Sequence, residues 1–335
     1  MSDVVPTEAE PTDIEFAILG AGAMGSIVGA HLARAGHKVV MLARGQRAMA
    51  LRADGLRIRG LVELDVPVQV IEEPAHLRSA RVFIVTTKAI GTATALAAYR
   101  HAKIDSAFSI QNGVMKDELL AAAFGKPAVL GALANISGEL LPDGAVLFTR
   151  NVNVAVGELA GGLSDRARNI SRALLDAGVR SKPVANVQSQ EWSKFAGWVG
   201  LVGVAITART YTWKYLLDPG GATVLVRLVR EVNQLATAQN ISLNDDSMFP
   251  VATLSAGPEA AAVEIVQSFG RQFRDNSPEH KLSTLQDVEA GRPLEVEETL
   301  GFAVRRARDL GLVLPLLEAT CYLAGTIDRS RSPKG

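Results

Sequence analysis

The sequence of 335 residues predicts an α/β domain with a mainly parallel sheet, followed by an all-helical domain. Up to about residue 187, apolar runs of strand length alternate with helical patterns, which is typical of a parallel sheet covered by helices. Beyond that point helical periodicity dominates, with proline- and glycine-containing breaks at 218–221, 256–258 and 291–293. The length also suits two domains, which we expect at residues 13–187 and 188–328.

Composition excludes several classes of protein. Lys and Arg (35) balance Asp and Glu (35), so neither a nucleic acid nor an anionic membrane is expected as a partner. Cys321 is the single cysteine and the histidines lack metal-ligand spacing, so we expect no disulfide, no metal site and a reducing, cytoplasmic location. Residues 1–12 predict a polar, disordered tail without the features of a secretory signal. The apolar stretch 195–208 is shorter than the roughly 20 residues of a membrane span and predicts a buried helix.

The first elements surround a glycine motif. A predicted strand at 14–19 is followed by glycines at G-x-G-x-x-G spacing, a helix at 26–35 and a second strand at 38–42. The first glycine of such a motif permits a tight turn, the second lets the backbone approach a pyrophosphate, and the third lets the helix pack closely. This context predicts a Rossmann-type dinucleotide-binding domain, with the phosphates held by Gly20, Gly22, Ala23, Met24 and Gly25.

The end of the second strand distinguishes between nicotinamide cofactors. NAD-binding domains of this type usually place an acid there, which accepts hydrogen bonds from the ribose 2′-hydroxyl. This chain instead has Arg44 and Arg47 and no carboxylate in that stretch. Because guanidinium groups suit a 2′-phosphate, the sequence favours NADPH. The alternative is that both arginines only solvate a loop.

Further elements follow in order. Strands are predicted at 66–71, 82–86, 106–110, 128–133, near Val146 and at 152–157, and helices at 89–99, 117–123 and 164–177, the last with Ser164 as N-cap and Gly178 after its end. Ligands of open α/β sheets bind beyond the carboxyl ends of the strands. Lys88 in the segment TTKA and Asn112 in the segment QNGV follow two such strands. They can reach the cofactor or the substrate, or can simply begin a helix and form a turn.

Taken together, these segments resemble the ketopantoate reductase family, also called 2-dehydropantoate 2-reductases. The resemblance rests on GAGAMG with Arg44, TTKA at 86–89, QNGV at 111–114, EWSK at 191–194 and LSTLQDVEAGRPLEVEETLGFAVRRARDLGLVLP at 282–315. It covers nearly the whole chain, from about residue 13 to residue 327. It implies NADPH-dependent reduction of a 2-oxo acid to a 2-hydroxy acid, with ketopantoate converted to pantoate in pantothenate biosynthesis.

The resemblance also implies roles for individual residues. Lys194 matches the family's catalytic lysine, which stabilises and then protonates the alkoxide formed by hydride transfer. Glu295 matches the active-site glutamate on the hydroxyl side of the substrate, and Ser283 matches a serine that helps to hold the substrate carboxylate. Asn112 matches an asparagine near the nicotinamide and the substrate, and Lys88 a lysine beside the phosphate-bearing ribose.

Two positions depart from the family pattern. The family has asparagines four and eight residues after the catalytic lysine, on the same helix face. Here these positions are Trp198 and Val202, so the substrate pocket is expected to be more apolar. A different substrate, such as a branched or aromatic 2-oxo acid, is therefore the alternative to ketopantoate. Trp198 can also cap a narrowed pocket, or the helix can be shifted by one turn.

Two further functions remain as alternatives. One is a non-catalytic NADPH-binding sensor, against which the presence of Lys194, Glu295 and Ser283 argues. The other is a 3-hydroxy acid dehydrogenase, whose lysine is normally followed four residues later by asparagine rather than by Trp198. The expected partner is a small-molecule 2-oxo acid, and the pattern is compatible with a monomer or a homodimer.

Overall fold

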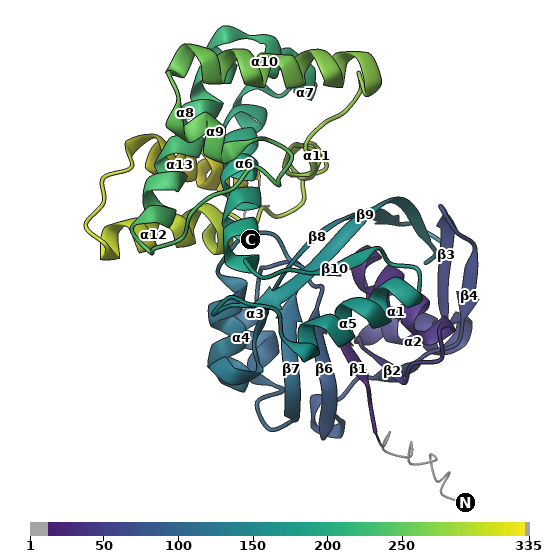
Figure 1. Cartoon of the computed structure of the whole chain (residues 1–335). Helices are drawn as coiled ribbons and strands as arrows, with labels where there is room; N and C mark the ends of the chain where they lie inside the picture. The colour runs from purple at the N-terminus through teal and green to yellow at the C-terminus, as the bar shows by residue number, and fades with distance from the viewer. Residues whose placement is uncertain (1–12, 332–335) are drawn as a thin grey trace, which may run out of the picture. The chain divides into compact units, whose positions relative to one another are not determined.

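The computed structural model describes residues 13–331 (Figure 1). The tail predicted at residues 1–12 lies outside this range. The chain divides into two compact units. One contains the residues up to Gln111 and Lys116–Val187, and the other contains Asn112–Met115 and the residues from Gln188 onward.

The first unit contains the predicted parallel sheet. Its strand order is β5-β2-β1-β6-β7, and all four neighbouring pairs are parallel. The strands are β1 (Phe16–Leu19), β2 (Val39–Leu42), β5 (Gln69–Ile71), β6 (Ser79–Val85) and β7 (Lys103–Ser109). Successive side chains of a strand point to opposite faces of the sheet, and β1 is buried along its whole length. Its side chains therefore alternate between two different hydrophobic cores. Ile18 packs in the core with Ile27 of the first helix, and Ala17 in the core with Leu96 and Leu120.

The first unit also contains helices. They are α1 (Ala23–Arg34), α2 (Gly45–Asp54), α3 (Thr92–Ala97), α4 (Lys116–Phe124) and α5 (Asp165–Asp176), with 3₁₀ turns η1 (Pro74–His76) and η2 (Lys126–Ala128). Ser164 caps α5 as predicted, because its hydroxyl accepts a hydrogen bond from the Ala167 N–H at 3.3 Å. Gly178 follows that helix at φ +98°, a left-handed conformation that favours glycine. Helix α3 begins three residues later than expected, after Gly91 at φ +74°.

A second sheet was not distinguished from the first by the sequence pattern. It has the order β10-β9-β3-β4, with β8 paired to β9 in antiparallel fashion. Its strands are β3 (Leu56–Gly60), β4 (Leu64–Val66), β8 (Leu130–Leu140), β9 (Val146–Glu158) and β10 (Ser181–Pro183). The single strand predicted at 66–71 is therefore wrong: the residues belong to β4 and β5, in different sheets, and Pro67 between them lacks the N–H that a continuous strand needs.

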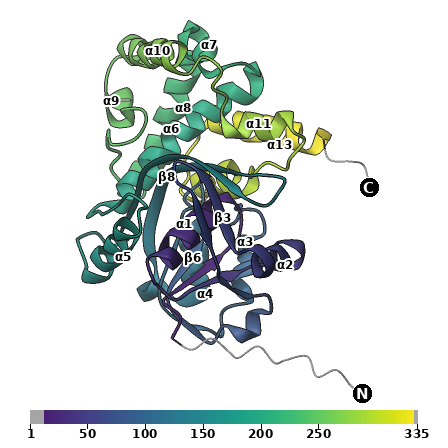
Figure 2. The same ribbon diagram turned by 90° about the vertical axis from the view of Figure 1, so that its right-hand side faces the viewer.

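The second unit is all-helical, as predicted (Figure 2). Its elements are α6 (Val187–Ala208), α7 (Thr212–Leu217), α8 (Pro219–Thr237), α9 (Val251–Ala256), α10 (Glu259–Asn276), α11 (Ser283–Glu289), η3 (Glu297–Gly301), α12 (Phe302–Asp309) and α13 (Pro315–Arg331). The predicted break at 218–221 is the start of α8, where the Asp218 carboxylate accepts a hydrogen bond from the Gly221 N–H at 2.8 Å. Pro219 occupies the first position of that helix, where its missing N–H costs nothing.

Helix α6 contains the predicted buried stretch. A Cβ added at Gly203 would lie 2.3 Å from Leu228 Cδ1 of α8, and one at Gly200 would lie 2.9 Å from Leu225 Cγ. The glycines therefore allow α6 and α8 to pack closely, which explains why the segment is both apolar and glycine-containing. Among residues 13–331, no helix is both long enough and apolar enough to cross a membrane.

Candidate active site

The turn after β1 has the geometry that the glycine spacing predicts. Gly20 has φ +107°, which favours glycine. A Cβ at Gly25 would lie 1.9 Å from the Gly20 carbonyl oxygen and 2.5 Å from Thr86 Oγ1. The Thr86 hydroxyl donates a hydrogen bond to that carbonyl at 2.7 Å. The third glycine is thus required by the turn itself, which Thr86 at the end of β6 holds in place.

Gly22 differs from the other two glycines because its surroundings are open. It is the exposed N-cap residue of α1, and no described atom lies within 4 Å of a Cβ built there. Its backbone can therefore be approached closely, and the half-buried Ala23 and Met24 begin the helix directly after it. The amide groups of the first helical turn, together with the helix dipole, suit an anion. This turn therefore fits the pyrophosphate of a dinucleotide.

The two arginines after β2 have different environments. Arg44 is the exposed N-cap residue of α2. Arg47 is half-buried and donates to the Ala21 carbonyl at 2.8 Å, to Ser26 Oγ at 2.9 Å and to the Gly144 carbonyl at 2.9 Å. Burial lowers the pKa of the Arg47 guanidinium. Arg47 therefore braces the glycine turn, and only Arg44 presents its side chain to solvent.

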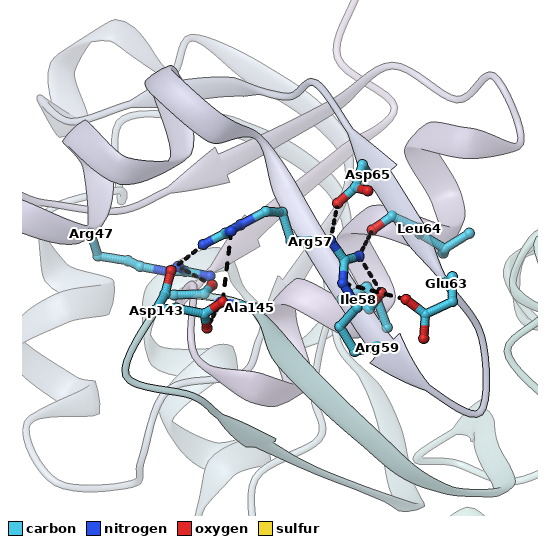
Figure 3. Close-up of polar contacts among 10 residues, drawn as sticks. Arg47, Arg57, Ile58, Arg59, Glu63, Leu64, Asp65, Asp143 and Ala145 are labelled. Atoms are coloured by element: carbon cyan, nitrogen blue, oxygen red, sulfur yellow. Dashed lines mark hydrogen bonds and ion pairs between the residues drawn. The ribbon is translucent and has the colours of Figure 1, made fainter.

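The Gly144 carbonyl, which accepts one of these Arg47 hydrogen bonds, lies in the turn between β8 and β9 (Figure 3). Arg57 of β3 donates to the Asp143 carbonyl, and its guanidinium lies 3.7 Å from the Asp143 carboxylate. That carboxylate in turn accepts a hydrogen bond from the Ala145 N–H at 3.0 Å. The second sheet thus supports the glycine turn of the first through Arg47.

We expect Arg47→Gln to weaken NADPH and NADH binding by similar factors, about tenfold each. The substitution is expected to loosen the glycine turn, whose geometry fits the pyrophosphate that both cofactors share. Dissociation constants measured by isothermal titration calorimetry for each cofactor test this expectation. A loss confined to NADPH would instead place Arg47 at the 2′-phosphate.

A carboxylate lies at the start of α2 that the local sequence did not reveal. Glu72 follows β5, which pairs with β2, and its Oε2 accepts a hydrogen bond from the Gly45 N–H at 2.7 Å. Its Oε1 lies 3.4 Å from the Arg52 guanidinium. The stretch after β2 contains no acid, but strand pairing brings this one beside Arg44. The N-terminus of α2 therefore carries both a cation and an anion.

The two polar segments after β6 and β7 are joined by Gln111. Its buried amide donates to Thr87 Oγ1 at 3.1 Å, to the Lys88 carbonyl at 3.0 Å and to Thr92 Oγ1 at 2.7 Å. The Lys88 side chain is exposed. Gln111 lies in the QNGV motif, but no local sequence pattern indicates its role. Its role is to hold the segment bearing Lys88 beside the segment that leads to Asn112.

In the helical unit, Lys194, Trp198 and Val202 lie at four-residue intervals on α6 and so share one face of that helix. Lys194 and Trp198 are half-buried, whereas Val202 is buried. A cavity of about 20 Å³ next to this face is lined by Trp198, Val202, Thr284, Asp287, Leu294, Glu295, Val296, Thr299, Leu300 and Ala324. Lys194 and Ser283 are not among these lining residues, and Ser283 is exposed at the first position of α11.

One wall of the cavity comes from the π-helical turn η3. Such turns are uncommon and often occur at functional sites. Thr299 in this turn donates its hydroxyl to the Glu295 carbonyl. The segment Asn112–Met115 belongs to the same compact unit, since a Cβ at Gly113 would lie 3.2 Å from Thr299 Cγ2. The exposed Asn112 is therefore part of the unit that contains Glu295, although it follows a strand of the other unit.

A glycine turn shaped for a pyrophosphate, in a chain whose helical unit carries a lysine and a glutamate near a cavity, is typical of two-domain oxidoreductases that use a nicotinamide dinucleotide. Two family models match the chain, "Ketopantoate reductase PanE/ApbA" over residues 16–161 and "Ketopantoate reductase PanE/ApbA C terminal" over residues 186–328. The chain belongs to the ketopantoate reductase family.

Individual relatives extend this result. A 2-dehydropantoate 2-reductase of Archaeoglobus fulgidus is 29% identical over 297 residues, covering 88% of this chain and 91% of the relative. A crystal structure of a PanE/ApbA family ketopantoate reductase from Ralstonia eutropha JMP134 has a TM-score of 0.78 and 25% identity, covering 95% of this chain and 99% of that chain. A D-mandelate dehydrogenase in complex with NADH and anilino(oxo)acetate shares the fold. Its TM-score is 0.79 at 16% identity, covering 95% of this chain and 99% of that chain.

Proposed function

We propose that the protein reduces ketopantoate to pantoate with NADPH, as a step of pantothenate biosynthesis in the cytoplasm. The observation that carries this proposal is the face of α6 that presents Lys194 one helical turn from Trp198, which lines a cavity together with Glu295. Relatives named 2-dehydropantoate 2-reductase, such as that of Archaeoglobus fulgidus, support the same reaction.

The chemistry assigns a role to each polar group. A bound nicotinamide cofactor would supply the hydride. Attack on the 2-oxo carbon leaves negative charge on its oxygen, which the Lys194 ammonium stabilises and then protonates. Glu295 contacts the substrate from the cavity wall, while Ser283 and Asn112 contribute hydrogen bonds to the substrate. Gly20, Gly22, Ala23, Met24 and Gly25 hold the cofactor's pyrophosphate, and Lys88 lies beside its ribose.

The preference for NADPH rests on Arg44. Its exposed guanidinium at the start of α2 can pair with a 2′-phosphate through charge-assisted hydrogen bonds. Arg47 does not share this role in the proposal, because its donors are bonded within the protein. Glu72 weakens the preference for NADPH in this proposal, because a carboxylate at the same helix end repels a phosphate.

We expect Glu72→Gln to strengthen NADPH binding by about threefold and to leave NADH binding nearly unchanged. The substitution removes a negative charge and keeps a side-chain oxygen that can accept the Gly45 N–H. Because the carboxylate is partly exposed, salt should reduce the effect. Cofactor titrations at low and high ionic strength measure it, and an unchanged NADPH affinity at low salt would contradict the proposed repulsion.

A second candidate function is reduction of a more apolar carbonyl substrate by the same chemistry. The observation that favours it is the aliphatic share of the cavity wall, where Val202 and Leu294 lie beside Trp198. NADPH oxidation followed at 340 nm with ketopantoate, branched 2-oxo acids and aromatic 2-oxo acids separates the two candidates. Turnover of any of these acids would exclude a non-catalytic sensor. Activity only with the branched or aromatic acids would contradict ketopantoate as the substrate and support the second candidate.

A further inference from the structure

The first unit contains a cavity of about 300 Å³ that takes no part in the proposed reaction. It is lined by the last turn of α1, the turn between β3 and β4, two residues of β9 and the residues directly after α5. None of these residues belongs to the glycine turn or to the groups assigned to cofactor and substrate above. Its volume equals that of about ten water molecules at roughly 30 Å³ each, so a ligand of about ten non-hydrogen atoms would fit.

His31 presents a hydrogen-bond acceptor to this cavity. The residue is buried, and its Nδ1 lies 2.8 Å from the Ile27 carbonyl oxygen, which can only accept. Burial lowers the pKa of the His31 imidazole, so at pH 7 the ring is neutral and its proton is on Nδ1. Nε2 is therefore an acceptor. It has no hydrogen-bond partner in the described part of the chain, but it is not one of the fully enclosed unsatisfied atoms.

The edge of the ring that carries Nε2 faces a glycine of the cavity wall. A Cβ built at Gly178 would lie 3.2 Å from His31 Cδ2 and 3.9 Å from Nε2. Both residues line the cavity, and because Gly178 has no side chain, it leaves this edge of the imidazole uncovered. A ligand in the cavity can therefore donate a hydrogen bond to Nε2.

Arg34 gives the cavity its charge. No acid lines the cavity and His31 is neutral, so Arg34 is the one lining residue that is charged at pH 7. Its exposed side chain has no ion pair or hydrogen bond with another residue between 13 and 331. Glu63, which lies in the β3–β4 turn, instead pairs with Arg59 at 3.3 Å. The guanidinium is therefore available for an anion that enters the cavity.

Most of the remaining wall is apolar. Leu61 is 59% exposed although it is a large aliphatic residue, and the buried Phe148 packs edge-on against His31 at a centroid distance of 5.5 Å. Asn151 donates a hydrogen bond to the Gly178 carbonyl at 3.0 Å, which holds the segment after α5 in place. An apolar group that covers Leu61 would remove its surface from water, which is favourable.

We propose that this cavity binds a small organic anion that has an apolar body and a hydroxyl group, such as an aromatic hydroxy acid. Arg34 pairs with the carboxylate, the hydroxyl donates to His31 Nε2, and the apolar body packs on Leu61 and Phe148. The site is separate from the proposed active site, so the inference does not depend on the proposed function.

Three related probes test the inference by isothermal titration calorimetry. We expect 4-hydroxyphenylacetate, with eleven non-hydrogen atoms, to bind with a Kd of about 1 mM or lower. Phenylacetate lacks the hydroxyl and 4-hydroxyphenylacetamide lacks the charge, so each should bind at least about fivefold more weakly. In nitrogen NMR spectra, the His31 Nε2 resonance should shift with 4-hydroxyphenylacetate but not with phenylacetate.

Variants locate the binding. Arg34→Gln should weaken binding of 4-hydroxyphenylacetate at least about fivefold and remove its advantage over the amide. Arg172→Gln is the matched control, because Arg172 is an exposed arginine of α5 that does not line the cavity. This variant should bind like the wild-type protein, and so should Lys194→Ala, because its substitution lies outside this cavity.

Three results would overturn the inference: no saturable binding of 4-hydroxyphenylacetate up to about 10 mM, an unchanged Kd in Arg34→Gln, or lost binding in Lys194→Ala. The last result would place the probe at the proposed active site. Equal binding of phenylacetate and 4-hydroxyphenylacetate would overturn the role of His31. Each of these results would leave the proposed reductase function standing, which NADPH oxidation tests separately.

Discussion

Replacing Lys194 with alanine is expected to lower kcat by about a thousandfold and to leave NADPH affinity within about twofold of the wild-type value. The physical reason is the charge that develops on the substrate oxygen during hydride transfer. An ammonium group stabilises that charge in the transition state far more than it stabilises the neutral ketone. Lys194 is half-buried on α6, and partial exclusion of water increases the strength of such an interaction.

Steady-state kinetics and cofactor titration together measure this prediction. Lys214→Ala is the matched control, because Lys214 is an exposed lysine on α7 in the same helical unit. A small primary amine added to the Lys194→Ala variant should restore part of the lost rate, whereas it should not affect the control. Near wild-type turnover in Lys194→Ala would refute the catalytic role, and an equal loss of NADPH binding would indicate a structural role instead.

Arg44→Asp is expected to weaken NADPH binding by about a hundredfold and to change NADH binding by less than about threefold. The substitution removes the guanidinium that we propose pairs with the 2′-phosphate, and places a second carboxylate beside Glu72. Only NADPH carries the 2′-phosphate, so the effect must depend on the cofactor. The new acid can also accept hydrogen bonds from the ribose hydroxyls of NADH.

Dissociation constants for both cofactors, measured by quenching of tryptophan fluorescence, report the change in preference. Arg47→Gln serves as the comparison, because it is expected to weaken both cofactors alike. Arg44→Gln separates loss of the cation from gain of an acid, and should show a smaller loss in the same direction. If the ratio of NADPH to NADH affinity stays unchanged in Arg44→Asp, the 2′-phosphate does not contact this residue.

The local features of the fold could be predicted from the sequence. The glycine spacing at Gly20, Gly22 and Gly25 depends on backbone conformation and close approach, which few other residues permit. The cap at Ser164 and the start of α8 at Asp218 depend on hydrogen bonds between residues three positions apart in the sequence. The change from alternating elements to continuous helices likewise follows from apolar periodicity along the chain.

The site was predictable only in part. The family motifs led to Lys194, Glu295 and Asn112, and the structure places all three in the helical unit. Val202, Trp198 and Glu295 line one cavity, whereas Ser283 is exposed beside Thr284, which does line it. No local signal indicates that a four-residue segment after β7 packs with the helices, because that packing involves the distant Thr299.

Other interactions depend on residues that are far apart in the sequence. Arg47 was predicted as a phosphate ligand together with Arg44, but its guanidinium bonds to Ala21 and, 97 positions away, to Gly144. Glu72 reaches the start of α2 only because β5 pairs with β2. The second sheet arose from similar long-range pairings, which a periodicity of two residues cannot assign to one sheet or another.

The sequence by itself determined the two-part architecture, the conformation of the glycine turn and the family to which the chain belongs, because these depend on short-range conformation and on motifs contiguous in the chain. The tertiary structure alone decided which arginine braces the turn, which acid accepts a hydrogen bond at the start of α2, and which side chains line the cavity beside α6. Side-chain pairing across the core depends on packing between distant segments, and no local pattern encodes it.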